Sequence, residues 1–168
     1  LLLSPVFAIV ALLIKRSSPG PVFYYQERRG FNLETFWIVK FRTMTDPRAS
    51  TGDPATDEER LTALGRWLRR TSLDELPELV NVLRGEMSLV GPRPARPVLV
   101  AQLKDQIRFY DVPHCIKPGI TGWAQVRYTY GSSIEDAQRK LQYDLYYVKN
   151  HSLALDVLVL VETIRVVL

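Results

Sequence analysis

The stretch RRTSLDELPEL, residues 69–79, places two arginines, two hydroxyl residues and two adjacent acids just before a proline. Ser72 and Glu75 have the spacing of a capping box, in which side chains satisfy free backbone N–H groups at a helix start. Pro77 favours a second alternative, because proline is preferred at the first position of a helix, which leaves Asp74 and Glu75 on the preceding turn. Both alternatives place the two carboxylates beside the free N–H groups of a helix start.

The pair Asp74–Glu75 also has the composition of a phosphoryl-transfer site. A helix start attracts phosphate, although two carboxylates alone would repel it. With Mg²⁺ between them, one carboxylate holds the metal ion while the other attacks phosphorus. Five basic residues offer charge-assisted hydrogen bonds to phosphate oxygens, although each taken singly is also typical of a solvated surface: Lys40, Arg42, Arg69, Arg70 and Arg93.

Upstream of this stretch, two β-like runs predict a hairpin. The first covers residues 22–28, and the second lies in TFWIVKFRTM, residues 35–44, with GFN as the turn. Residues 45–56 are rich in Pro, Gly, Ser, Thr and Asp, which predicts a loop. Period-two alternation gives the second strand one face of Trp37, Val39 and Phe41 and an opposite face of Phe36, Ile38, Lys40 and Arg42.

Helical periodicity accounts for most of the remaining chain. The segment KPGITGWAQVRY, residues 117–128, is the exception and predicts a loop followed by a strand. The last helix is apolar on nearly every side, so it needs a core, a partner or a bilayer surface. The predicted helices cover residues 57–70, 73–84, 97–110, 133–149 and 153–168.

The composition is that of one folded domain over residues 1–168. A chain of 168 residues can bury a real core, and a hydrophobic content of 46% excludes a disordered protein. The net charge of +4 is compatible with a phosphate-bearing ligand or an anionic lipid surface. This charge is too small to indicate a nucleic acid partner, so none is predicted. The predicted fold class is α+β.

The first residues, LLLSPVFAIVALLIKR at 1–16, begin inside an apolar helix, which suggests a fragment of a longer chain. The apolar part would be about 21 Å long as a helix, shorter than a hydrocarbon core of roughly 30 Å. Ser4-Pro5 would kink or break it. Three alternatives remain, namely the end of a spanning helix, a re-entrant helix that turns at Ser4-Pro5, and a core helix. Lys15 and Arg16 would mark the cytoplasmic side of a membrane.

Five strings together resemble the bacterial sugar transferase family, whose members are monotopic phosphoglycosyl transferases. The most specific feature is TSLDELPEL followed by GPRP. The resemblance implies transfer of a phosphosugar from a UDP-sugar to undecaprenyl phosphate, with release of UMP, at the start of bacterial exopolysaccharide, O-antigen or capsule assembly. The strings follow the family order over nearly the whole chain and are SSPGPVFYYQERRG, FWIVKFRTM, LGRWLRRTSLDELPELVNVLRGEMSLVGPRP, KPGITGWAQV and YDLYYVKNHSLALDV.

The resemblance implies roles for particular residues. Asp74 falls on the nucleophile of the family, which forms a covalent phosphosugar intermediate, and Glu75 falls on the residue that helps hold Mg²⁺. Phosphate binding is the expected role of Lys40, Arg42, Arg70 and Arg93.

The segment TGWAQVRYTYG mixes aromatic residues with Gln125 and Arg127. Two alternatives remain for it. Trp123 either packs on the core from a strand or, together with Gln125, forms a wall that stacks uracil or contacts the sugar, since aromatic faces suit nucleobase stacking.

The resemblance further implies a monotopic protein of the bacterial inner membrane with its active site facing the cytoplasm. Residues 1–16 would form the re-entrant helix, broken at Ser4-Pro5, and residues 17–168 the cytoplasmic part, with amphipathic helices at the membrane surface. The implied partners are the UDP-sugar, undecaprenyl phosphate and membrane lipids. The sequence does not separate one sugar from another, and it leaves the oligomeric state open, including a homo-oligomer. The competing hypothesis is a non-catalytic membrane-surface scaffold for glycan-assembly enzymes.

Overall fold

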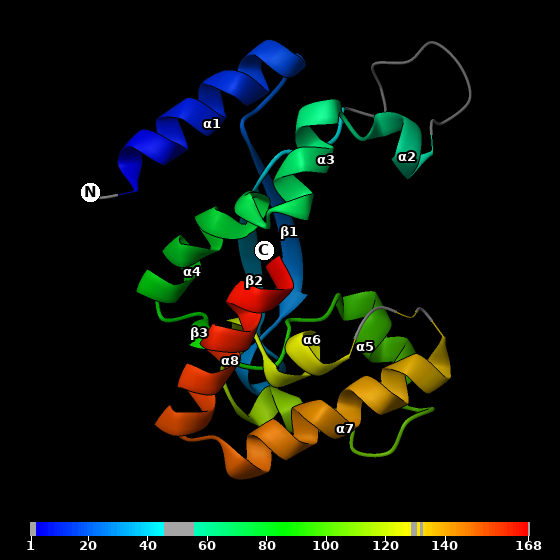
Figure 1. Ribbon diagram of the computed structural model, residues 1–168. Helices are drawn as coiled ribbons and strands as arrows, with labels where there is room; N and C mark the ends of the chain where they lie inside the picture. The colour runs from blue at the N-terminus through cyan, green and yellow to red at the C-terminus, as the bar shows by residue number, and fades with distance from the viewer. Residues whose placement is uncertain (1–2, 46–55, 129–130, 132, 168) are drawn as a thin grey trace. The chain divides into compact units, whose positions relative to one another are not determined.

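The computed structural model describes residues 3–45, 56–128, 131 and 133–167 (Figure 1). Helices together with two small two-stranded sheets confirm the predicted α+β class. In chain order the elements are α1 (Ser4–Ser17), β1 (Phe23–Arg29), η1 (Phe31–Leu33), β2 (Thr35–Phe41), α2 (Asp57–Arg60), α3 (Ala63–Arg70), η3 (Leu73–Glu78), α4 (Leu79–Leu83), β3 (Ser88–Val90), α5 (Pro97–Leu103), η4 (Val112–Cys115), β4 (Gly119–Thr121), α6 (Trp123–Arg127), α7 (Ile134–Asn150) and α8 (Leu153–Val167).

The chain divides into two compact units, each built from two separate stretches. The first unit comprises Leu1–Tyr25 and Val39–Pro77, and the second comprises Gln26–Ile38 and Glu78–Leu168. The predicted hairpin is confirmed, since β1 and β2 pair in one sheet. The boundary between the units falls within both strands, so each unit contains part of the hairpin.

The core of the first unit joins α1, β2 and α3. Val10 and Ile14 are four residues apart, so they share one face of α1 and are buried together. They pack with Phe41 from β2 and Leu68 from α3. The Phe41 ring also stacks on that of Phe23, with 5.5 Å between ring centroids. The exposed apolar side chains of α1 and the residue before it are Leu3, Val6, Ile9, Leu12 and Leu13.

Helix α1 begins at Ser4 with Pro5 in its first turn, where the missing N–H of proline leaves no hydrogen bond unmade. Ser4-Pro5 therefore marks the start of the helix in the described chain. Leu1 and Leu2, the remainder of the predicted re-entrant segment, lie outside the described residues. Among the helices that the structure describes, none combines the length and apolar character needed to cross a bilayer. The re-entrant helix stays a prediction.

The buried face of β2 changes along the strand. In the second unit Phe36 and Ile38 are buried in a cluster with Met87, while Trp37 between them is 57% exposed. In the first unit Val39 and Phe41 are buried instead. Alternation predicted the side-chain directions, but not that the buried face changes as the strand passes from one unit to the other.

Two predicted helices are shorter than expected. The helix over 57–70 is interrupted because Leu61 and Thr62 are extended, and the Thr62 hydroxyl caps α3 by accepting the Gly65 N–H at 2.9 Å. Capping by a threonine side chain starts a new helix at this point. The helix over 97–110 ends at Leu103, and Phe109 has a left-handed φ of 65° that helical backbone does not allow.

The predicted strand over Trp123 is wrong. The strand β4 covers Gly119–Thr121, and α6 follows it directly. β4 pairs in parallel with β3, with Ser88 opposite Gly119 and Val90 opposite Thr121. This pairing depends on glycine, because a Cβ atom on Gly119 would lie 2.1 Å from the backbone nitrogen of Gly91. Both strands have three residues, so the ladder is short.

In the second unit α8 contacts both strands of this small parallel sheet, and α6 contacts both α7 and α8. α7 and α8 follow one another as the orange and red helices of Figure 1. Val90, Tyr147 and Val159 form the buried cluster between them. The Tyr147 hydroxyl donates to the Asp156 carboxylate at 2.6 Å, which joins α7 to α8. The remaining apolar surface of α8 is exposed, with Leu153, Val157, Leu158, Leu160, Val161, Ile164 and Val166.

The first prediction concerns the core of the first unit. Leu68 is fully buried, so Leu68→Ala should lower the free energy of unfolding by about 3 kcal/mol through lost burial and the cavity left behind. Leu83 is 88% exposed, and Leu83→Ala should change the stability by less than about 0.5 kcal/mol. Urea unfolding followed by tryptophan fluorescence measures both, and equal losses would contradict this core.

Candidate active site

The acidic pair lies at the start of a 3-10 helix, Leu73–Glu78, which contains Pro77. The predicted capping box is wrong, because Ser72 has a φ of 54° instead of the extended backbone of a capping residue. Its backbone carbonyl, not its hydroxyl, accepts the Glu75 N–H at 3.2 Å. The alternative of a helix starting at Pro77 is also wrong, since the 3-10 helix starts four residues earlier. Asp74 and Glu75 nevertheless occupy the first turn of this helix, as both alternatives required.

A close ion pair connects the acidic stretch to the hairpin. The Lys40 ammonium group donates to the Glu75 carboxylate at 2.6 Å. The side chains are 13% and 16% exposed, so the pair is poorly hydrated and stronger than a surface pair. The structure thus brings together two predicted site residues that lie 35 positions apart in the sequence.

Asp74 is 9% exposed. Its burial, and secondly the neighbouring Glu75 carboxylate, raise the pKa of Asp74 above its ordinary value. The positive charges of Lys40 and Arg69 act in the opposite direction. Desolvation and nearby cations of this kind are typical of carboxyl groups that react with, or bind beside, an anionic substrate.

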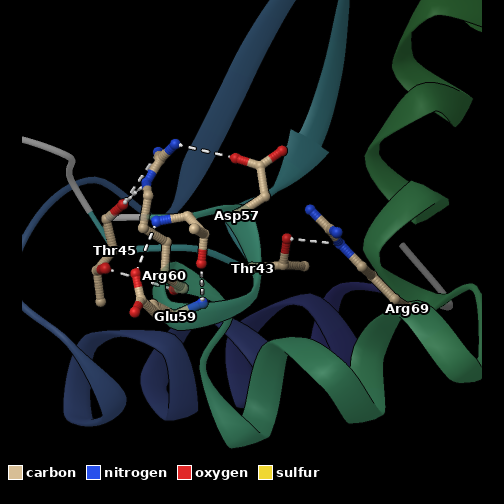
Figure 2. A network of polar contacts seen from close by, with 7 residues as sticks. Thr43, Thr45, Asp57, Glu59, Arg60 and Arg69 are labelled. Atoms are coloured by element: carbon tan, nitrogen blue, oxygen red, sulfur yellow. Dashed lines mark hydrogen bonds and ion pairs between the residues drawn. The ribbon is translucent and has the colours of Figure 1, made fainter. Parts of the chain in front are cut away.

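Arg69 is the arginine that acts on Asp74, whereas the prediction selected Arg70. The Arg69 Nε donates to the Thr43 hydroxyl at 3.1 Å, and Figure 2 shows the two side chains facing each other. Arg70 is exposed. Helical periodicity contained the signal, because Arg69 lies about 100° and Arg70 about 200° around the helix from the buried Leu68. The role predicted for Arg70 in phosphate binding stays a prediction.

A polar network in the first unit connects the two ends of residues 46–55, which are outside the described residues (Figure 2). The Arg60 Nε and Nη2 groups donate to the Thr45 carbonyl at 3.3 and 3.2 Å, and the Thr45 N–H donates back to the Arg60 carbonyl at 2.9 Å. Thr56 and Glu59 form a capping box at the start of α2. Arg60 therefore binds the residue at the start of the predicted loop, and the capping box lies at the end of that loop.

The other predicted site residues are distributed between the units. Arg42 lies in the first unit, with its guanidinium group at the end of α1. Arg93 follows β3 in the second unit and is partly buried, and Gln125 lies on α6, where its amide nitrogen donates to the Ile120 carbonyl at 3.2 Å. The Gln125 side-chain oxygen is buried without a hydrogen-bond partner among the described residues.

Trp123 packs against the buried cluster of Val90, Tyr147 and Val159, in agreement with the core alternative. Its ring is stacked with Tyr146, with 6.0 Å between centroids, and the Arg127 guanidinium lies 4.5 Å from the ring centroid. Contacts with a nucleobase or sugar stay a prediction for Trp123 and Gln125.

The buried Asp144 on α7, with the partly buried Lys140 one turn before it, was not predicted as a feature of interest. Asp144 is 8% exposed, its Oδ1 has no hydrogen-bond partner among the described residues, and burial raises its pKa to about 6 against the opposing charge of Lys140. Burial lowers the pKa of Lys140, Asp144 opposes that change, and Arg93 and Arg28 add to it. The spacing of four residues between Lys140 and Asp144, which places them on one helix face, was the available signal.

The magnesium ion implied by the family resemblance stays a prediction. Within the described ranges, no group of three or more His, Cys, Asp or Glu side chains could hold a metal ion by itself. Mg²⁺ is usually bound by one or two carboxylates together with substrate phosphates, so the Glu75 carboxylate is a chemically suitable protein ligand. Glu75 already binds a positive group, the Lys40 ammonium.

The sequence matches the family described as bacterial sugar transferase over residues 1–168. The site described above, with adjacent carboxylates beside Lys40 and Arg69, therefore lies in a chain that belongs to the bacterial sugar transferase family, as the strings of the sequence indicated.

Named relatives support this membership. The chain is 44% identical, over 99% of its length, to the UDP-N-acetylgalactosamine-undecaprenyl-phosphate N-acetylgalactosaminephosphotransferase of Aeromonas hydrophila. It is 44% identical, over 98% of its length, to the undecaprenyl-phosphate glucose phosphotransferase of Komagataeibacter xylinus. The chain spans 40% and 32% of these two proteins. It spans 77% of the uncharacterized sugar transferase EpsL of Bacillus subtilis, which is 44% identical over 97% of the chain.

The second prediction tests the ion pair. A double-mutant cycle with Lys40→Met and Glu75→Gln should give a coupling energy on the order of 1–3 kcal/mol in urea unfolding, because both groups are poorly hydrated. The control is the pair Arg165–Glu162 at 2.9 Å, whose arginine is 69% exposed, and its coupling should stay below about 0.5 kcal/mol. Equal coupling energies would show that the burial of the first pair does not strengthen it.

The third prediction concerns Asp144. Carbon-detected NMR of its carboxyl group should give a titration midpoint near pH 6, above the ordinary value of 3.8. Since folding raises this pKa, the protonated carboxyl stabilises the fold below pH 3.8, and that stabilisation is lost as the pH rises through 6. Asp144→Asn should remove this part of the pH dependence of unfolding. A midpoint at the ordinary value would contradict the burial of the carboxyl.

Proposed function

We propose that this chain is the catalytic part of a phosphoglycosyl transferase, which transfers a phosphosugar from a UDP-sugar to undecaprenyl phosphate and releases UMP. The observation that carries this proposal is the poorly hydrated Asp74 carboxyl beside Glu75, Lys40 and Arg69. The names of the relatives support the same substrates, a nucleotide sugar and undecaprenyl phosphate. In this arrangement a carboxylate nucleophile lies next to cations that can neutralise phosphate oxygens.

The reaction would proceed in two displacements at one phosphorus atom. An oxygen of Asp74 forms a bond to the β-phosphorus of the UDP-sugar, and the bond from that phosphorus to the bridging oxygen breaks, so the oxygen leaves with UMP. A phosphate oxygen of undecaprenyl phosphate then forms a bond to the same phosphorus and displaces the Asp74 carboxylate. The product is an undecaprenyl diphosphate sugar, and no further reactant is consumed.

The surrounding residues would bind and orient the phosphates. Glu75 would hold Mg²⁺, which when bound neutralises charge on the diphosphate. Lys40 keeps the Glu75 carboxylate in place in the described structure. Arg69 is added to the proposed phosphate-binding set, because it already acts on Asp74. The residues carried over from the sequence into this proposed set are Lys40, Arg70 and Arg93, and Trp123 and Gln125 are carried over as proposed contacts of the nucleobase or the sugar.

The acceptor is a lipid, so the proposal places the protein at the cytoplasmic face of the bacterial inner membrane. The exposed apolar side chains on one face of α1 support contact with lipid, and residues 1–16 are proposed as a re-entrant helix broken at Ser4-Pro5. The exposed apolar surface of α8 supports a position at the membrane surface. The two 44% identical relatives are named for N-acetylgalactosamine and for glucose, so identity does not select the sugar.

The fourth prediction tests the reaction with the full-length protein in nanodiscs that contain undecaprenyl phosphate and Mg²⁺. A panel of UDP-sugars should give UMP from one or a few sugars. Without the lipid acceptor, mass spectrometry should detect a phosphosugar on the peptide containing Asp74. Asp74→Asn should lose both the UMP and the adduct, because an amide is a far weaker nucleophile than a carboxylate. The exposed Asp105 provides the matched control, and Asp105→Asn should keep both.

Two outcomes would contradict the proposal. An adduct that persists in Asp74→Asn would remove the nucleophile assignment. The non-catalytic scaffold would be favoured by two results together. No UDP-sugar would give UMP, and Asp74→Asn would support polymer initiation in cells as well as the wild type does. A scaffold requires membrane binding and does not require the acidic pair.

A further inference from the structure

Arg42 follows β2 directly and shares a strand face with Lys40, two positions earlier. Its side chain does not approach the acidic pair in the way that Lys40 does. The Arg42 Nη2 group donates to the Ser18 carbonyl at 2.8 Å and to the Ser18 hydroxyl at 3.0 Å, and Nη1 donates to the Pro19 carbonyl at 2.5 Å. The hydrogen bonds of this guanidinium group therefore go to the residues that leave α1.

The position is favourable on electrostatic grounds. The C-terminal end of a helix carries partial negative charge, and Ser18 and Pro19 directly follow the last turn of α1. The planar guanidinium group presents several donors in a fixed fork, which matches two neighbouring carbonyls better than a lysine ammonium group does. Lys15, in the last turn of α1, adds a second cation by donating to the Gly20 carbonyl at 3.0 Å.

The turn after α1 is shaped around this guanidinium group. Gly20 has a φ of +123°, which L side chains rarely adopt, and a Cβ atom placed there would lie 2.2 Å from the Arg42 Nη1. The Arg42 N–H also donates to the Val22 carbonyl at 2.9 Å. Arg42 is thus bound through both its backbone and its side chain to the segment that connects α1 to β1.

We propose that Arg42 is a positioning residue that sets where the apolar face of α1 lies relative to Asp74 and Glu75, instead of a ligand of the substrate phosphates. The connection runs from α1 through Arg42 to β2, and from β2 through Lys40 to Glu75, all within the first unit. It rests on the proposed function, in which lipid held beside α1 must present its phosphate to Asp74. Loss of the Arg42 contacts then impairs use of the lipid acceptor and leaves recognition of the nucleotide sugar unchanged.

The fifth prediction is that the lipid acceptor and the nucleotide sugar respond differently to loss of Arg42. In full-length protein in nanodiscs, Arg42→Gln should raise the KM for undecaprenyl phosphate on the order of tenfold, the effect of about 1.4 kcal/mol. The KM for the UDP-sugar should stay within about twofold, because the nucleotide sugar does not contact this turn. Arg66 is an exposed arginine of the same unit, and Arg66→Gln should leave both constants unchanged. Arg42→Lys should restore the lipid KM in part, since it keeps the charge without the fork.

Gly20→Ala tests the same contact without removing a charge. The added methyl group displaces the guanidinium group, so this variant should reproduce the rise in the lipid KM. A phosphate-binding role for Arg42 predicts the opposite division, with a raised UDP-sugar KM in Arg42→Gln and normal kinetics in Gly20→Ala. That result, or unchanged constants in both variants, would overturn the proposal.

Hydrogen exchange separates this proposal from the proposed function. The Ser18 N–H donates to the Ile14 carbonyl at 3.2 Å in the last turn of α1. Its exchange should be faster in Arg42→Gln than in the wild type, while the amides of α3 exchange at the same rate in both. Unchanged exchange at Ser18 would overturn the positioning role even in an active enzyme. If the wild type releases no UMP from any sugar, the proposed function fails, whatever the exchange rates are.

Discussion

The ion pair between Lys40 and Glu75 is the interaction on which the candidate site depends. It joins a strand to a 3-10 helix 35 positions later, and it places the Glu75 carboxylate in a poorly hydrated position next to Asp74. A buried carboxylate requires a nearby positive charge, since desolvation disfavours its ionised form. Lys40 supplies that charge to Glu75, and its charge also favours the ionised form of Asp74.

The sequence predicted the elements with regular periodicity and the residues with a distinctive motif. The hairpin and the long helix α7 were found because they have clear repeats of two and about 3.6 residues, and α8 was found as a long run of apolar residues. The capping box at Ser72 was wrong, since spacing does not report the backbone φ that decides whether a serine can cap. The strand over Trp123 was wrong because α6 begins there directly after β4, and β4 itself pairs with β3 through a close approach of Gly91 and Gly119, which is a tertiary contact.

The site was predictable in its residue types more than in its contacts. Asp74, Glu75 and Lys40 come together, although Lys40 pairs with Glu75 and its expected role was phosphate binding. Arg42 lies on the same strand face as Lys40 and has a different partner. Strand alternation predicts the direction of a side chain, but it does not predict which residue the side chain contacts. Asp144 was missed for a related reason, because its burial depends on packing between elements that are far apart in the sequence.

The division of the chain between the two units also determines which unit is completed first during synthesis. Every residue of the first unit lies within Leu1–Pro77, whereas the second unit needs the chain as far as Leu168. During translation, which folds proteins from the N-terminus, the core around Leu68 can therefore close over one face of α1 before the last helix exists. Once Pro77 has left the ribosome, the nascent chain contains the acidic pair and its lysine, while α7 and α8 of the second unit have not yet emerged.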